Sequence, residues 1–404
     1  LLQGDVGSGK TIVAFMSILI AIDNGFQTCL MAPTEILSVQ HYDSFIEIAK
    51  TLKINIKILT GSTKDSFKKE IYNALEKGEI DLLIGTHSLI QDKVKFKNLG
   101  LAIIDEQHKF GVAQRSMLWA KNIIPPNMLI MTATPIPRTL TMSAYGDLDI
   151  SIIDELPPGR KEITTVHRND NKRLSVFKFI KDQIQEGRQI YIVYPLIEES
   201  KKMDYKDLMD GYDSITREFP SPKYQISIVH GRMKAADKDY EMKRFEDKKT
   251  QILVATTVIE VGVNIPNASV MIIESSERFG LSQLHQLRGR VGRGRHKSYC
   301  ILMSGNKISR ESKERLKTMT STNNGFLIAE KDLEIRGPGD IMGTQQSGVI
   351  SLKIADIVSD KEILKLTREF AIKILNEDKS LILKKNTELL NTYTYLNKNK
   401  DIWG

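Results

Sequence analysis

The residues best suited to chemistry lie at the start of the chain. Residues 4–11 read Gly-Asp-Val-Gly-Ser-Gly-Lys-Thr, which fits the G-x-x-x-x-G-K-[ST] pattern of a phosphate-binding loop. Lys10 is expected to contact the β- and γ-phosphates of a nucleoside triphosphate, and the Thr11 hydroxyl to hold Mg²⁺. A chance glycine-rich turn is the alternative, but an expected strand before the loop and an apolar helix after it favour phosphate binding. The predicted nucleotide contacts are Gly4, Asp5, Val6, Gly7, Ser8, Gly9, Lys10 and Thr11.

A pair of adjacent acids supplies the second part of this chemistry. Asp105 and Glu106 follow the apolar run 101–104. Burying two carboxylates at the end of a strand is costly unless a cation or a proton compensates. We therefore expect Asp105 to be the partner of Mg²⁺, directly or through water, and Glu106 to orient and deprotonate the attacking water. A solvated acidic turn is the alternative, and the upstream phosphate loop argues against it.

An arginine-rich segment follows later in the chain. Residues 286–293 read Gln-Leu-Arg-Gly-Arg-Val-Gly-Arg. Phosphoryl transfer needs cations near the γ-phosphate as charge shifts, and arginine side chains supply them. Arg290 and Arg293 are the candidates for this catalytic role. The alternative is a basic surface turn on a phosphate backbone, a role open to Arg288 and Arg295.

The elements that must position these residues alternate along the chain. Helical patterns such as Thr11–Asn24 and Ile36–Leu52 separate short apolar runs, which predicts a parallel sheet with helices on both faces. Ligands bind such sheets at the edge where the strands end. The expected strands are Thr28–Ala32, Ile56–Thr60, Leu82–Gly85, Leu101–Asp105 and Leu129–Thr132.

The same alternation restarts after a proline- and glycine-containing linker at Asp154–Arg160. Helical patterns at Lys172–Glu186 and Ala235–Asp247 separate some of the runs, which predicts a second α/β domain. The polar insert Lys201–Pro222 is expected to be a loop or a helical excursion, and Ser309–Thr322 a helix. The expected strands are Ile163–His167, Gln189–Pro195, Ile226–His230, Ile252–Ala255, Val270–Glu274 and Ser298–Met303.

Bulk properties allow this organisation and exclude others. The 404 residues suggest two to three domains, and the net charge of +8 favours a polyanionic partner without establishing one. The longest apolar run, 12–22, is too short to cross a bilayer, so we expect no membrane association. The two cysteines, Cys29 and Cys300, have no metal-ligand spacing and are expected to be buried thiols in a reducing compartment.

Together these motifs resemble a superfamily 2 helicase, and most closely the RecG family of bacterial branched-DNA helicases. The resemblance covers about residues 1–350. It rests on the phosphate loop, Met31–Leu37, Gly85–His87, Asp105–Val112, Met131–Leu140, Ile153–Arg160, His230–Met233, Ala255–Pro266, Gln283–Gly294 and the glycine-rich segment Gly325–Gly348. It implies an α/β fold with two RecA-like parallel-sheet lobes in tandem, followed by a helical hairpin and a C-terminal extension. The implied domains are lobe 1 at 1–155, lobe 2 at 156–305 and the translocation-motif hairpin with its helical extension at 306–404.

The resemblance also implies an activity and its partners. These are ATP-dependent DNA unwinding or double-stranded DNA translocation, with ATP and Mg²⁺, on stalled forks and Holliday junctions in DNA repair and recombination. A monomer in the bacterial cytoplasm at the nucleoid is expected, with single-stranded DNA-binding protein as an additional partner. The chain opens on Leu1 and shows neither the family's wedge domain nor its adenine-contacting segment, so we expect an N-terminally truncated fragment.

Further site residues carry over by motif position. Gly262 is expected at the nucleotide. DNA contacts are expected at Pro33, Thr34, Thr86, His87 and Thr257. Coupling between nucleotide and DNA is expected to involve Gln107, His108, Thr132, Thr134, Gln286, Arg315, Arg336 and Gln346.

Two other functions remain open. The first is a motor similar to the transcription-repair coupling factor Mfd, which would keep the ATPase and change the partner. Residues 105–108, Asp-Glu-Gln-His where Mfd has Asp-Glu-Glu-His, favour RecG. The second is a nucleic-acid binding module with a decayed ATPase, and the intact Lys10, Asp105, Glu106 and Arg293 argue against it.

Overall fold

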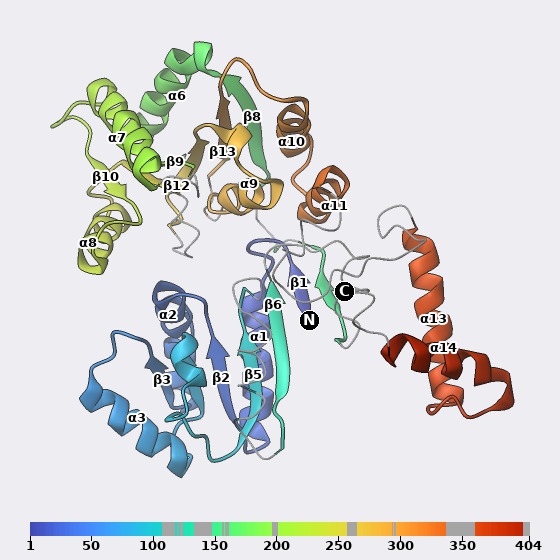
Figure 1. Cartoon of the computed structure of the whole chain (residues 1–404). Helices are drawn as coiled ribbons and strands as arrows, with labels where there is room; N and C mark the ends of the chain where they lie inside the picture. The colour runs from blue at the N-terminus through green and yellow to red at the C-terminus, as the bar shows by residue number, and fades with distance from the viewer. Residues whose placement is uncertain are drawn as a thin grey trace. The chain divides into compact units, whose positions relative to one another are not determined.

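The described part of the chain contains two parallel sheets (Figure 1). The computed structural model describes residues 1–106, 118, 121, 124–132, 148–155, 157, 161–195, 201–256, 265–292, 294, 296–336 and 360–398. The chain divides into two compact units. The first contains both sheets, within residues 1–135 and 150–328, and the second contains residues 136–149 and 329–404.

The first sheet, with its helices, is called the first lobe. Its strands lie in the order β3-β4-β2-β5-β6-β1-β7, and all described pairings are parallel. Their bounds are β1 Leu2–Gly4, β2 Gln27–Met31, β3 Ile56–Leu59, β4 Leu82–Gly85, β5 Leu99–Ile104, β6 Asn127–Thr132 and β7 Ser151–Ile153. The last strand was not predicted from the sequence.

Alternation along the central strands divides the core of the first lobe between two faces. Leu30 packs with Ala14 and Phe15 of α1, whereas Cys29 packs with Ile71 and Leu75 of α3. The helices are α1 Lys10–Asp23, α2 Glu35–Leu52 and α3 Asp65–Lys77, with a 3₁₀ turn η1 at His87–Ile90. A parallel sheet covered on both faces results, and the carboxyl ends of its strands form one edge.

The second sheet, with its helices, is called the second lobe. Its strand order is β10-β11-β9-β12-β13-β8, again parallel throughout the described pairings. The strands are β8 Ile163–Asn169, β9 Gln189–Tyr194, β10 Ile226–Val229, β11 Ile252–Thr256, β12 Ala268–Ile273 and β13 Ser298–Ser304. Its helical segments are η3 Asp170–Lys172, α6 Arg173–Gln185, α7 Lys201–Glu218, α8 Ala235–Glu246, η5 Ser276–Arg278 and α9 Leu281–Arg288.

The polar insert Lys201–Pro222, expected to be a loop or a helical excursion, is helical. Helix α7 contributes Leu208 and Ile215 to the core, and Phe219 beyond its end stacks edge-on against Phe177 with ring centroids 5.8 Å apart. The insert is therefore part of the second lobe's hydrophobic core.

Helices follow the second sheet, as expected. They are α10 Arg310–Ser321 and α11 Gly325–Arg336, and then α13 Lys361–Glu377, η6 Lys384–Asn386 and α14 Thr387–Lys398 in the second compact unit. The predicted fold class, two RecA-like lobes followed by helices, is confirmed. Both cysteines are free and buried, and burial raises the pKa of each thiol to about 12. No helix among the described segments is long and apolar enough to cross a membrane.

Candidate nucleotide site

The phosphate loop connects β1 to α1 at the carboxyl edge of the first sheet. Gly9 has φ 101°, in the left-handed region that favours glycine, and stands directly before the first turn of α1. No side chain caps that turn, and a helix N-terminus of this kind can bind an anion. At Gly4 the loop folds so closely that an added Cβ would lie 2.4 Å from Ser8 Oγ. The loop is therefore tightly folded, as the predicted phosphate-binding loop should be.

Lys10 lies inside this loop. Its ammonium group donates to the carbonyls of Gly4 at 2.8 Å and Asp5 at 2.9 Å, and the side chain is buried. The hydroxyl of Ser8 is buried without a hydrogen-bond partner among the described residues. A buried hydroxyl normally has a partner, so this group fits a site completed by a ligand oxygen. Thr11 follows, half-buried, in the first turn of α1.

Asp105 lies directly after β5, at the same edge. Its Oδ2 is 2.9 Å from His41 Nε2 of α2, and its Oδ1 accepts from the Glu106 N–H at 3.0 Å. Burial opposes ionisation, but the hydrogen bond and charge of His41, with the nearby Lys10 charge, lower the pKa of Asp105. The carboxylate is therefore held ionised, as a Mg²⁺ partner must be. Sequence reasoning missed His41, because a lone histidine on a helix carries no motif.

Glu106 adopts an unusual backbone conformation. Its φ is 53°, in the left-handed region that non-glycine residues seldom occupy. Such conformations persist only where the surrounding structure holds them, and they concentrate at functional sites.

Magnesium held with a nucleotide needs few protein ligands. Mg²⁺ in such sites takes one or two protein oxygens, with phosphate oxygens and water completing its octahedron. Asp105 and Thr11 are the oxygen donors of the right kind here. Within the described ranges there is no cluster of three or more His, Cys, Asp or Glu that would hold a metal independently.

The arginine-rich segment runs from the end of α9. Arg290 and Gln286 are half-buried. Arg288 is only 2% exposed and donates to the carbonyls of Met319 and Thr322 at 3.0 and 2.8 Å. The possibility that Arg288 is a surface contact for a phosphate backbone is therefore wrong, since its guanidinium is used inside the protein.

The expected DNA contacts of the first lobe follow β2 and β4. Thr34 begins α2, where its hydroxyl accepts from the Leu37 N–H at 3.4 Å. Thr86 is buried, with its hydroxyl 3.4 Å from Ser88 Oγ. Pro33 is half-buried and His87 is exposed. All four lie at the carboxyl edge that carries the phosphate loop.

Other expected coupling residues are only partly described. Thr132 ends β6 and is buried. Arg315 of α10 donates to the Glu277 carbonyl and to Ser312 Oγ, both at 3.0 Å, and pairs with Glu311 at 3.3 Å. Gln107, His108, Thr134, Thr257, Gly262, Arg293 and Gln346 lie outside the described residues, as does the side chain of Arg336.

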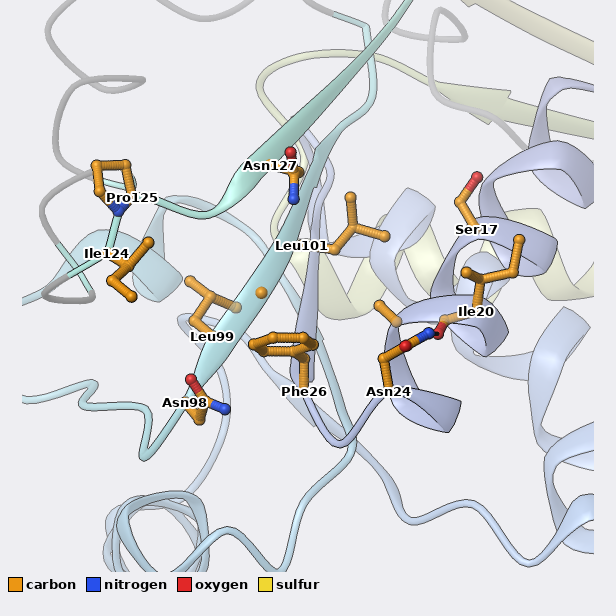
Figure 2. Close-up of a pocket in the computed structure, with 12 residues that line it drawn as sticks. Ser17, Ile20, Asn24, Phe26, Asn98, Leu99, Leu101, Ile124, Pro125 and Asn127 are labelled. Atoms are coloured by element: carbon orange, nitrogen blue, oxygen red, sulfur yellow. Dashed lines mark hydrogen bonds between the residues drawn. The ribbon is translucent and has the colours of Figure 1, made fainter.

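A separate apolar pocket opens in the first lobe, away from this edge. It encloses about 520 Å³ between the end of α1 and the beginnings of β5 and β6. Figure 2 shows the Phe26 ring lying beside Leu99, and the absence of a side chain at Gly100 makes room for that ring. The lining has no charged side chain, so this pocket is unsuited to phosphate chemistry.

Two tandem RecA-like lobes, with a phosphate-loop sequence and an acid pair on the first, are the arrangement that is typical of two-lobed helicase motors. Three family models match in succession: DEAD/DEAH box helicase at residues 1–143, helicase conserved C-terminal domain at 171–295, and ATP-dependent DNA helicase RecG, domain 3, C-terminal, at 322–404.

Similar proteins agree with these models. An ATP-dependent DNA helicase RecG from Synechocystis is 50% identical over 94% of this chain and 46% of its own length. The Bacillus subtilis protein of the same name is 49% identical over 94% of this chain and 55% of its own. A solved structure of RecG bound to a three-way DNA junction is 44% identical, with TM-score 0.71, covering 90% of this chain and 47% of that chain.

The chain is similar to RecG helicases over about 94% of its own length, and its residues 322–404 match the RecG family model. It spans about half the length of the curated relatives it matches.

Proposed function

We propose that the protein is an ATP-dependent DNA helicase and double-stranded DNA translocase that remodels stalled replication forks and Holliday junctions in DNA repair and recombination. The observation that supports this most is the joint position of Lys10 and Asp105. Both lie at one strand edge, beside a phosphate loop that leads into a helix N-terminus without a side-chain cap. The relatives' names and the junction-bound RecG structure supply the DNA substrate class.

Residues of the first lobe would bind the phosphates, hold the metal ion and activate the attacking water. Residues 4–9 cradle the phosphates through backbone N–H groups, and Lys10 exchanges its two carbonyl partners for phosphate oxygens. Thr11 and Asp105 would hold Mg²⁺, which neutralises phosphate charge when bound. Glu106 orients the attacking water and accepts its proton.

The second lobe supplies cations and a connection to DNA. Arg290 and Arg293 stabilise the charge that develops on the transferring phosphoryl group. Pro33, Thr34, Thr86, His87 and Thr257 contact DNA, and the remaining coupling residues transmit lobe closure to it. Contacts of this kind go largely to phosphates, so DNA affinity should fall steeply with salt.

Several finer assignments belong to the same proposal. Lobe 1 comprises residues 1–155, lobe 2 residues 156–305, and residues 306–404 form the translocation hairpin and extension. The protein acts as a monomer on DNA at the bacterial nucleoid, and a single-stranded DNA-binding protein is a further partner.

ATP turnover on branched DNA tests the proposal. In the intact protein, Glu106→Gln should abolish DNA-stimulated ATP hydrolysis while leaving ATP binding, because an amide cannot accept the proton. Glu79→Gln, which changes an exposed acid of the same lobe, is the matched control. Turnover near the wild-type rate in Glu106→Gln would remove the assigned base.

The arginine assignment is tested separately. Arg293→Ala should keep ATP binding and lose hydrolysis, since the cation acts on charge that develops in the transition state. Arg310→Ala, at the exposed start of α10, is its control. Lost ATP binding in Arg293→Ala would contradict a role restricted to the transition state.

A further inference from the structure

The carboxylate of Asp5 connects the phosphate loop to two segments distant in sequence. Its Oδ1 lies 2.6 Å from His285 Nε2 of α9 and also accepts from the Val6 N–H at 2.6 Å. Its Oδ2 accepts from the N–H of Gly325, the first residue of α11, at 3.3 Å. Burial opposes ionisation, but the hydrogen bonds from His285 and the two N–H groups lower the pKa of Asp5.

His285 lies between Asp5 and a cation. The ring is 4% exposed, and its Nδ1 is 2.9 Å from a guanidinium nitrogen of Arg288. A guanidinium can only donate and a carboxylate can only accept. An imidazole with its hydrogen on Nε2 satisfies both neighbours, donating to Asp5 and accepting from Arg288. The ring is thereby fixed in one orientation and one tautomer.

Arg288 extends this series of contacts to the end of α10. It donates to the Met319 and Thr322 carbonyls, which lie at the negative end of that helix. The connection between α10 and α11 is therefore held at both sides, by Arg288 at Thr322 and by Asp5 at Gly325. Residues 322–325 are called the hairpin turn.

Asp5 also belongs to the site that nucleotide binding must change. Its carbonyl accepts from the Lys10 ammonium, the group that a phosphate would recruit. Close packing strengthens the connection, because a Cβ added at Gly289 would lie 2.7 Å from Val6 Cβ. A shift of the Asp5 peptide on phosphate binding therefore changes groups that hold the hairpin turn.

We propose that His285 is a positioning residue that makes the hairpin turn respond to nucleotide at the phosphate loop. The Asp5–His285–Arg288 contacts transmit occupancy of the loop to the end of α10, and the Asp5–Gly325 contact transmits it to the start of α11. The role rests on the proposed function, because movement of the hairpin matters only if the motor moves DNA.

Hydrogen exchange of the hairpin-turn amides, with and without a non-hydrolysable ATP analogue, tests this role in the intact protein. In the wild type the analogue should change exchange at residues 319–325. His285→Leu, which keeps bulk and removes both hydrogen bonds, should reduce that response about tenfold, as expected for losing a charge-assisted hydrogen bond. His285→Gln should restore most of it, since its amide can donate to Asp5 and accept from Arg288.

Three further measurements secure the interpretation. His296→Leu, an exposed histidine of the same lobe, should respond as the wild type does. If His285→Leu does not fold, Asp5→Asn replaces it, and this variant should also lose the response. On branched DNA, His285→Leu should consume about tenfold more ATP per fork remodelled, by the same loss.

The outcomes separate this inference from the proposed function. If the analogue changes hydrogen exchange in His285→Leu as much as in the wild type, the role of His285 is overturned. The same result in Asp5→Asn, where that variant replaces His285→Leu, also overturns it. Because the exchange experiment needs no DNA, an intact response in a protein that does not remodel DNA would contradict the proposed function and leave only the contact between nucleotide and hairpin turn supported.

Discussion

The two lobes share one topology and differ in what their strand ends carry. Both place their first six strands in the order 3-4-2-5-6-1. Lys10 is the first residue of α1 and Arg173 the first residue of α6, the helices that follow the first strand of each lobe. Asp105 and Glu274 directly follow the fifth strands, β5 and β12. The second lobe therefore has a cation and an acid at the positions that correspond to Lys10 and Asp105 of the candidate nucleotide site.

The partners of these charges differ. Arg173 forms a two-pronged pair with Glu274, at 2.7 and 2.8 Å, and a third bond to Asp170 at 2.8 Å. The bonds to Glu274 raise the pKa of Arg173 above its usual range. Lys10 instead rests on two uncharged carbonyls. The corresponding cation of the second lobe is thus neutralised by carboxylates, whereas Lys10 donates to backbone carbonyls and its charge lies near Asp105.

The two lobes also differ in the length of the loop between their first strand and first helix. The chain runs from Gly4 to Lys10 between β1 and α1, but only a short 3₁₀ turn, η3, separates β8 from α6. A short turn has too few N–H groups to surround a phosphate. Both lobes have the same strand edge, and we expect the loop and the charge partners to determine which of the two edges binds a nucleotide.

The largest expected difference between the lobes is the effect on ATP turnover of removing Lys10 or Arg173. Lys10→Ala should lower DNA-stimulated ATP turnover by about 10²–10³-fold, the usual cost of losing one charge-stabilising donor. Arg173→Ala, its counterpart, should leave the turnover within a few-fold of wild type at temperatures where the second lobe stays folded. Steady-state turnover at saturating branched DNA measures both. Equal losses in the two variants would show that the lobes are not chemically distinct.

The next largest effect concerns stability of the second lobe. Glu274→Gln should cost about 3 kcal/mol of unfolding free energy, because it leaves the partly buried Arg173 with a weakened partner set. Urea unfolding measures the change, and ATP affinity should not alter. Glu246→Gln, in an exposed pair with Lys243, should leave the free energy of unfolding nearly unchanged, because solvent screens such a pair. Lost ATP affinity in Glu274→Gln would place the pair in the nucleotide site.

A feature common to both lobes sharpens the comparison. The second strand of each lobe begins with a buried glutamine, Gln27 or Gln189, whose amide donates to two carbonyls of neighbouring segments. Gln27→Leu and Gln189→Leu should each cost about 2 kcal/mol in urea unfolding, because buried carbonyls lose their donors. A cost confined to one variant would mean that this support is not shared.

The smallest effect is acid sensitivity at the phosphate loop. The folded-state pKa of Asp5 is below its unfolded value of 3.8. Its contribution to stability is therefore complete above that value and is lost as pH falls through the folded pKa. Asp5→Asn should lower stability at neutral pH and flatten the decline below about pH 4. Unfolding midpoints between pH 2 and 7 test this, and an unchanged acid decline would contradict it.

Much of this architecture could be predicted from the sequence. Short apolar runs bounded by glycine and proline located the strands well, because strands buried on both faces need continuous apolar residues. β7 was missed because its three residues, Ser151–Ile153, are too few to show a pattern. The phosphate loop and acid pair could be located because their chemistry depends on residues close together in the chain.

Contacts between distant segments could not be predicted. His41 meets Asp105 across 64 positions, and His285 meets Asp5 across 280. No spacing rule joins such residues, since the fold alone brings them together. The buried capping role of Arg288 was hidden for the same reason, because its partners are backbone carbonyls that any sequence supplies.

The central claim is that the nucleotide site belongs to the first lobe and has a closed counterpart in the second. The most direct test is calorimetric titration of the intact Glu106→Gln protein with ATP and Mg²⁺, where slowed hydrolysis leaves binding visible. The account predicts one site per chain, lost on adding Lys10→Ala and retained on adding Arg173→Ala. A second site, or binding that survives Lys10→Ala and disappears with Arg173→Ala, would contradict it.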